Sequence, residues 1–211
     1  HVLARVGGPL ELNGLVQISS EVADTLSSSD RWLKLNGITH LDEDSAKALA
    51  KCDHISLDSL RGLSPESAGY FLKHKHLAVI EGMPIITSEL VRLLVDSTDE
   101  LVLDLRRLSS IDKATAEALL NGPDELSLGG ITSLSPAIAS ILAIGRQELA
   151  LDGLRTMSKN LAASLVNSPL SSISLNGLSR LSSDAAQVLS DFDGTLSLDG
   201  LPTVSKSVAA S

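Results

Sequence analysis

Aromatic residues, cysteine and long hydrophobic runs are all scarce in this 211-residue chain. Aromatic residues make up 2% of the sequence although 43% of it is hydrophobic, so the core must be built mainly from Leu, Ile, Val and Ala. Side chains of such similar size suit many small, equivalent layers better than one large interior. The single cysteine, Cys52, excludes an internal disulfide framework and a thiolate zinc cage, and we expect it to be a packed apolar residue.

Basic clusters and membrane-spanning runs are also missing. The formal net charge of -9 argues against a nucleic-acid partner, because affinity for nucleic acid comes mostly from Lys and Arg. No apolar run approaches the roughly 18 to 20 residues that span a bilayer, so membrane insertion is not expected. The first residues show no secretion signal. Because the chain starts at His1 rather than Met, the localisation stays open, and an extracellular or cell-surface protein whose signal was removed is compatible with it.

The sequence does contain an internal repeat. The segments ISLNGLSRLSSDAAQVL (173–189) and LKLNGITHLDEDSAKAL (33–49) share one order of leucine, Asn-Gly, helix-capping residue, alanine and leucine. Alignment on the glycine gives nine copies, about 23 residues apart. We expect this glycine to supply a positive φ where the chain leaves a strand. The glycine column reads Gly14, Gly37, Ser59, Gly82, Arg107, Gly130, Gly153, Gly177 and Gly200.

Each copy predicts a short strand followed by a short helix. Two apolar residues that alternate with polar ones precede the glycine, which indicates a strand with one buried face. A good N-cap residue follows the glycine, with an apolar residue, usually alanine, four residues later and a large apolar residue seven residues later, which places both on one helical face. The predicted caps are Ser19, Asp42, Ser64, Thr87, Asp112, Ser135, Ser158, Ser182 and Ser205.

This arrangement resembles the leucine-rich repeat family, in a bacterial-type variant with an apolar column (Leu15, Ile38, Leu60 and their equivalents) in place of the usual Asn or Cys. The resemblance covers nearly the whole chain. It implies an α/β fold: a right-handed solenoid of about nine repeats over residues 1–211, with parallel strands on the concave face and short helices on the convex face. It also implies a protein-protein interaction module rather than an enzyme.

The outward residues of the predicted strands form the candidate binding surface. In a stacked parallel sheet, equivalent residues of successive repeats lie about 4.8 Å apart. The outward columns hold eight acidic residues and two basic ones, which favours a neutral or basic partner. An apolar patch of Trp32, Leu77, Val79 and Val102 is not needed for the core, and Trp is favoured where binding energy concentrates. The candidate binding residues are Trp32, His54, Leu77, Val79, Val102, Lys34, Arg106, Glu81 and Asp104.

The expected function is a non-enzymatic scaffold that binds a protein or polymer on its concave face. The alternative is a structural spacer within a larger surface or secreted protein, and an enzymatic role requires a domain outside this chain. No phosphate-binding loop, nucleophile elbow or zinc-helix motif is present, so no catalytic residue, metal or cofactor is expected. A metal site at Asp53, His54, His74 and His76 is a weaker hypothesis.

The two ends of the array lack polar capping units. The last repeat still carries Leu196, Leu198 and Leu201, whose apolar edge a further repeat would cover. We therefore expect the natural protein to continue beyond Ser211, and the last repeat of this chain either to fray or to pair its edge with another molecule. Self-association through the last repeat is one form that such pairing can take.

Overall fold

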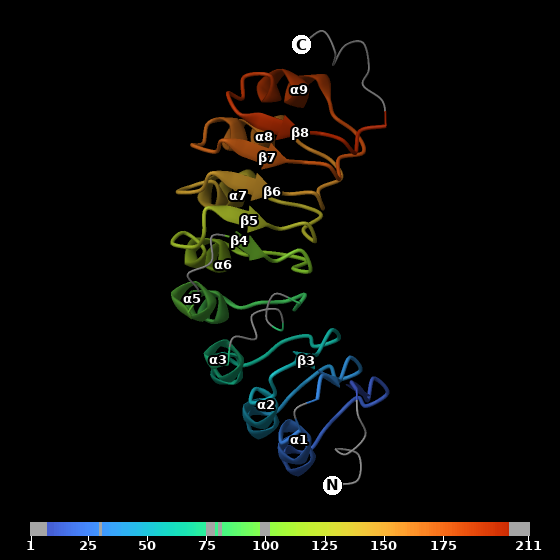
Figure 1. Cartoon of the computed structure of the whole chain (residues 1–211). Helices are drawn as coiled ribbons and strands as arrows, with labels where there is room; N and C mark the ends of the chain where they lie inside the picture. The colour runs from blue at the N-terminus through green and yellow to red at the C-terminus, as the bar shows by residue number, and fades with distance from the viewer. Residues whose placement is uncertain (1–7, 30, 75–78, 80–81, 98–101, 203–211) are drawn as a thin grey trace. The chain divides into compact units, whose positions relative to one another are not determined.

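The structure is a computed structural model, and it describes residues 8–29, 31–74, 79, 82–97 and 102–202. The chain divides into two compact units, His1–Ser97 (unit 1) and Thr98–Ser211 (unit 2). Among the described residues strands and helices alternate, except that the helices Pro65–Lys73 and Ser88–Ser97 follow one another with no described strand between them. All paired strands are parallel (Figure 1). The α/β class predicted from the repeat is therefore confirmed, while one continuous array over residues 1–211 stays a prediction.

Unit 1 contains a parallel sheet in the order β1-β2-β3. The strands pair in the register of the sequence repeat, so Leu10 lies opposite Leu33, and Leu33 lies opposite Ile55. The helices pack in chain order, α1 on α2, α2 on α3 and α3 on α5. The elements are β1 (Leu10–Glu11), α1 (Ser20–Ser27), β2 (Leu33–Lys34), α2 (Glu43–Leu49), β3 (Ile55–Ser56), α3 (Pro65–Lys73) and α5 (Ser88–Ser97).

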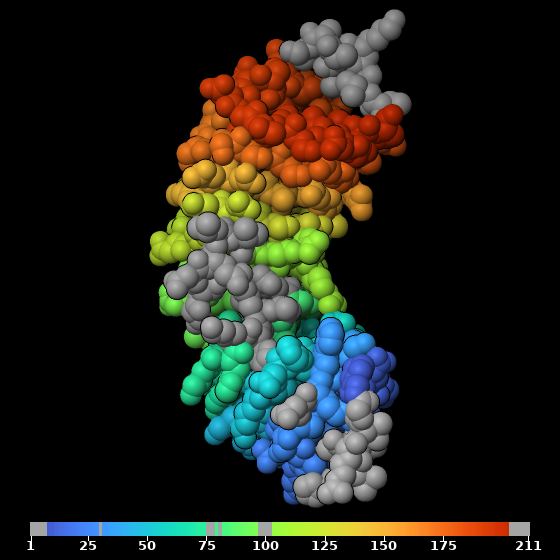
Figure 2. Space-filling model, in the orientation of Figure 1, coloured from blue at the N-terminus to red at the C-terminus, as the bar shows by residue number. Residues whose placement is uncertain are grey.

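Unit 2 contains a parallel sheet in the order β4-β5-β6-β7-β8. Its repeats follow one another as successive layers, from green to red in Figure 2. The helices again pack on their neighbours in chain order. The elements are β4 (Val102–Asp104), α6 (Lys113–Ala118), β5 (Glu125–Ser127), α7 (Pro136–Leu142), β6 (Glu148–Ala150), α8 (Lys159–Val166), β7 (Ser172–Ser174), α9 (Ser183–Leu189) and β8 (Thr195–Ser197).

The predicted helix caps are confirmed at every repeat whose cap is described. In each case the side-chain oxygen accepts a hydrogen bond from the backbone N–H three residues later, for example 2.7 Å from Ser45 to Asp42 and 3.2 Å from Leu161 to Ser158. These bonds satisfy a donor that the first helical turn leaves unpaired. The capping residues are Ser19, Asp42, Ser64, Thr87, Asp112, Ser135, Ser158 and Ser182. Ser205 lies outside the described residues.

The core of each repeat is formed by the predicted columns. The small residue four positions after the cap is buried in every described helix, as Ala23, Ala46 and Ala139 illustrate with no exposed surface. The large residue seven positions after the cap is buried as well, and Phe71 fills this place in α3. Because the small residue has so little bulk, each helix lies close to the strand leucines of its own repeat.

Arg146 is the one charged side chain among the buried polar residues of the described chain. Its Nη1 donates to the carbonyl of Leu142 at 2.7 Å and its Nη2 donates to the carbonyl of Leu119. Burial lowers the pKa of Arg146 to about 10, so the guanidinium remains charged at neutral pH. The positive charge therefore stabilises the C-terminal ends of α6 and α7 and ties two neighbouring repeats together.

The fourth repeat departs from the predicted pattern. A strand was expected there with Ala78 and Ile80 inward and Val79 outward, but Ala78 and Ile80 lie outside the described residues. Val79 is only 7% exposed, and it lines a small hollow of unit 1 together with Ile55 and Leu57. The assignment of Val79 to an exposed surface was therefore wrong, because its side chain packs with apolar neighbours.

The glycine column has a different physical cause from the one expected. Among the described glycines only Gly8 and Gly145 have a positive φ, so the repeat glycines do not relieve backbone strain. A Cβ at Gly130 would instead lie 2.5 Å from the carbonyl oxygens of Arg106 and Leu108, in the repeat before it. Gly153 is equally restricted, with a Cβ 2.5 Å from the carbonyls of Gly129 and Ile131. Glycine is required because adjacent repeats approach backbone to backbone.

Some repeats lack the glycine because glycine is required only where the backbone of another repeat lies against the turn. Ser59 and Arg107 take the place of glycine in the third and fifth repeats, and both side chains are exposed. At Gly14, in the first repeat, a Cβ would meet no atom of the described residues within 4 Å. The sequence repeats the glycine, but the steric need for it depends on what lies against each turn.

Gly153→Ala is expected to lower the free energy of unfolding by about 1 to 3 kcal/mol, since backbone carbonyls cannot move aside without separating two repeats. Thermal and denaturant unfolding measure this change. The matched control is Gly14→Ala in dilute solution, where the added methyl group meets nothing and stability should stay within about 1 kcal/mol of the wild type. Equal losses at both positions would contradict the steric explanation.

Candidate functional site

The strand face of unit 1 gathers three side chains around an exposed tryptophan. Trp32 is 53% exposed, just before β2, and its ring centroid lies 6.3 Å from that of His54 in the next repeat. The Nζ of Lys34 lies 5.6 Å from the Trp32 ring centroid and 2.7 Å from Oε1 of Glu11. We call Glu11, Trp32, Lys34 and His54 the Trp32 cluster.

Parallel pairing in register explains how this cluster forms. Glu11 and Lys34 are Cα partners on β1 and β2, so their side chains project from the same face one strand apart. Leu33 donates a backbone hydrogen bond to the carbonyl of His54 at 2.9 Å. This bond holds the backbone of His54 next to that of Trp32 and Leu33. The lysine ammonium over the aromatic ring is a cation–π contact, and the ion pair with Glu11 holds the lysine there. The cluster therefore presents a supported aromatic surface to solvent.

The other predicted site residues do not all join this cluster. Asp104 and Arg106 belong to unit 2, where Nη2 of Arg106 lies 2.5 Å from Oδ2 of Asp104 and the backbone N–H of Arg106 donates to Oδ1 of Asp104 at 3.1 Å. Val102 begins β4, but its side chain lies outside the described part of the structure, as do Leu77 and Glu81. Of the predicted residues, the structure brings Trp32, Lys34 and His54 together.

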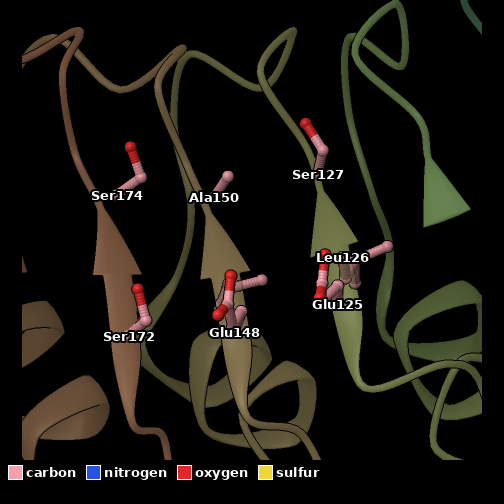
Figure 3. A pocket seen from close by; sticks show the side chains of 8 residues that line it. Glu125, Leu126, Ser127, Glu148, Ala150, Ser172 and Ser174 are labelled. Carbon is pink, nitrogen blue, oxygen red and sulfur yellow. The ribbon is translucent and has the colours of Figure 1, made fainter. Parts of the chain in front are cut away.

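The strand face of unit 2 carries a shallow hollow of about 110 Å³ over β5, β6 and β7. Figure 3 shows Glu125, Glu148 and Ser172 in one row across the three strands, with Ser127, Ala150 and Ser174 in a second row. Glu125 and Glu148 are Cα partners on adjacent strands, so two like charges stand side by side. Such pairs are mutually destabilising, and a positive group between them would relieve the repulsion.

A ladder of side-chain hydrogen bonds runs along the turns that follow the strands. In unit 1, Oδ1 of Asn13 accepts from the backbone N–H of Asn36 at 3.1 Å. Oδ1 of Asn36 then accepts from the N–H of Asp58 at 3.2 Å and from the hydroxyl of Ser56 at 2.6 Å. Each side chain thus accepts from the repeat that follows it. We call these Asn and Asp residues, with their counterparts in unit 2, the Asx ladder.

Unit 2 repeats the same bonds. Oδ1 of Asp152 accepts from the N–H of Asn176 at 2.8 Å and the hydroxyl of Ser174 at 2.6 Å. Oδ1 of Asn176 accepts from the N–H of Asp199 at 2.8 Å and the hydroxyl of Ser197 at 2.6 Å. The sequence pattern predicted turn and charged residues in this column, but not the ladder. The signal was the serine two residues before Asp58, Asn176 and Asp199, although Lys34 takes this place before Asn36.

Chemistry at other residues is limited. Cys52 is buried, and burial followed by the negative charge of Asp53 raises the pKa of its thiol to about 11, so it is a weak nucleophile at neutral pH. In the described ranges, no three His, Cys, Asp or Glu side chains lie close enough to hold a metal ion. His76, one of the hypothetical metal ligands, falls outside those ranges. None of the described helices has the length and hydrophobicity of a membrane span.

Comparison with known proteins adds no assignment. No protein-family model matches the sequence, and no curated protein matches it at a significant level.

Asn176→Ala tests the Asx ladder. The change removes the acceptor for the Asp199 N–H and the Ser197 hydroxyl, and it should lower the free energy of unfolding by about 1 to 2 kcal/mol, because water replaces part of these half-exposed bonds. Thermal unfolding measures the loss. The control is Asn160→Ala on the exposed surface of α8, which should change stability by less than about 0.5 kcal/mol. Equal stability of the two variants would show that the ladder contributes nothing.

Proposed function

We propose that this chain is a non-enzymatic interaction scaffold that binds a protein or polymer partner on its strand face. The observation that carries the proposal is Trp32, the largest exposed apolar side chain of the described residues, which is 53% exposed beside Lys34 and His54. The exposed half of this side chain contributes no buried surface to unit 1. Buried under a partner, it is the residue type that most often dominates binding energy.

The charge of the strand face defines the partner further. Glu125 and Glu148 stand side by side without a basic neighbour in the lining of the hollow, and the chain as a whole carries a net charge of -9. A neutral or basic partner meets favourable electrostatics here, whereas nucleic acid would be repelled. Lys34 and Arg106 each pair with a carboxylate, so they orient a partner rather than attract an anion.

The fold that we propose for this role is a leucine-rich-repeat solenoid with right-handed connections. Three observations support it: parallel strands in register, one capped helix after each strand from β1 to β7, and backbone contact between successive repeats at the glycine turns. In such a fold every repeat adds one row of outward side chains to a common strand face. Binding residues can then vary from repeat to repeat without disturbing the core.

A structural spacer is the second candidate, and the Asx ladder favours it. Asn36, Asp152 and Asn176 use their side-chain oxygens for bonds between repeats, so these polar groups hold the array together rather than face a ligand. A surface devoted entirely to internal bonds is what a spacer needs. Trp32 and the hollow over β5–β7 are the features that a spacer leaves unexplained.

Trp32→Ala separates the two candidates. If the Trp32 cluster is a binding surface, partners captured by the wild-type chain should bind the variant at least about 30-fold more weakly, equivalent to about 2 kcal/mol, in titration calorimetry. The control is Ile144→Ala, which removes an apolar side chain of similar exposure, 54%, after α7. Unchanged affinity for Trp32→Ala, or the absence of any captured partner, would favour the spacer.

A further inference from the structure

Trp32 is an isolated apolar surface on the strand face of unit 1. It lies just before β2 and is more than half exposed. The other exposed large apolar side chains described in unit 1 lie in turns or on a helix and not on a strand: Leu15, Val16, Val22 and Ile85. A ligand that binds at Trp32 therefore has to match one aromatic ring and its polar surroundings rather than a broad apolar patch.

Polar side chains surround this ring from the neighbouring repeats. The His54 ring is inclined by 49° to the indole at a centroid distance of 6.3 Å, and Nζ of Lys34 lies 5.6 Å from the indole centroid. Oε1 of Glu11 accepts from that Nζ at 2.7 Å. The cluster thus offers an ammonium donor, a carboxylate acceptor and an imidazole, which in its neutral form has one donor and one acceptor.

The charges of the cluster compensate each other. Lys34 and Glu11 form an ion pair, so together they add no net charge. A cationic ligand would compete with Lys34, whose ammonium already lies over the ring. An anionic ligand would meet the carboxylate of Glu11 and a chain with a net charge of -9. The cluster therefore favours a neutral ligand with hydroxyl groups, which both donate and accept hydrogen bonds.

We propose that the Trp32 cluster is a binding site for a neutral carbohydrate. One face of a pyranose ring carries C–H groups, which would pack on the indole, because these groups meet the negative face of its π system. The hydroxyl groups at the edge of the same ring would bond to Lys34, Glu11 and His54. This inference rests on the proposed function, and it narrows the polymer partner to a chain of neutral sugars.

Backbone contacts hold the cluster in place before a ligand arrives. The carbonyl of Trp32 accepts from the N–H of Leu10 on β1 at 2.8 Å. The guanidinium of Arg31 donates to the carbonyls of Gly8 and Pro9 at 2.7 and 3.1 Å, which ties the segment before β2 to the segment before β1. A ligand then loses little binding energy to the ordering of its site.

The span of the cluster indicates the size of the ligand. Glu11 lies on β1, Lys34 on β2 and His54 just before β3, so three neighbouring repeats contribute. Adjacent strands lie about 4.8 Å apart, so the cluster spans roughly 10 Å. This exceeds a single pyranose ring, and a trisaccharide is therefore a suitable probe.

Fluorescence titration tests the proposal, since Trp32 is the only tryptophan of the chain and reports on the site directly. The probes are four neutral trisaccharides: cellotriose, maltotriose, mannotriose and triacetylchitotriose. At least one should change the emission of Trp32 in a saturable way, with a dissociation constant below about 1 mM. Binding should be insensitive to salt, and trigalacturonic acid, an anionic counterpart, should bind at least about tenfold more weakly.

Titration calorimetry with the trisaccharide that binds best then compares two variants. Trp32→Ala should weaken binding at least about tenfold, and circular dichroism verifies that the variant is folded. The control is Ile85→Ala, which removes an exposed apolar side chain from the segment before α5 and should bind like the wild type.

Two results would overturn the carbohydrate site: no saturable response to any of the four neutral probes, or equal binding by Trp32→Ala and the wild type. Either result can be told apart from failure of the proposed function. If Trp32→Ala still loses a captured protein partner, the interaction scaffold stands and only the carbohydrate is excluded.

Discussion

Close backbone contact between successive repeats is the constraint on which the rest of this structure depends. At Gly130 and Gly153 the neighbouring repeat comes so near that a single methyl group has no room. The short distance between the backbones of neighbouring repeats allows their strands to pair in register. The pairing brings the strand leucines and the small helix residues of adjacent repeats into contact in the core. The side chains within a repeat are few and similar, so its stability comes from its neighbours rather than from its own interior.

The Asx ladder extends the same constraint to polar groups. In four of the turns after strands, a side-chain oxygen of the repeat before accepts from the backbone N–H; these acceptors belong to Asn13, Asn36, Asp152 and Asn176. Serine hydroxyls on the receiving strand complete the arrangement at Asn36, Asp152 and Asn176. Part of the acidic character of the strand face is therefore structural. The residues free to meet a partner are those outside the ladder, above all Trp32, Glu125 and Glu148.

Much of the fold could be predicted because its signals are local. Helix caps, the buried alanine column and the strand leucines follow from spacing within one repeat, and in the described residues they are confirmed. The position of Trp32 beside His54 and Lys34 could be predicted too, because strands that stack in register bring equivalent residues together. Contacts between residues about one repeat apart were harder to predict. The expected cause of the glycine column was wrong and the ladder was missed, because in both cases the contacting partner lies in another repeat.

The hydrogen bonds of the ladder all have the same sense, since an earlier repeat accepts and a later repeat donates. A repeat with a ladder residue carries its own acceptor and donor together with its own helix cap and glycine. Such a repeat therefore contains all the groups that it needs to pack on its neighbours. Duplication or loss of one such segment in a gene would lengthen or shorten the protein by one layer and leave every remaining junction chemically unchanged. The protein can therefore gain or lose whole repeats without a change in its core. An insertion whose length is far from that of a repeat would break the register of the parallel strands.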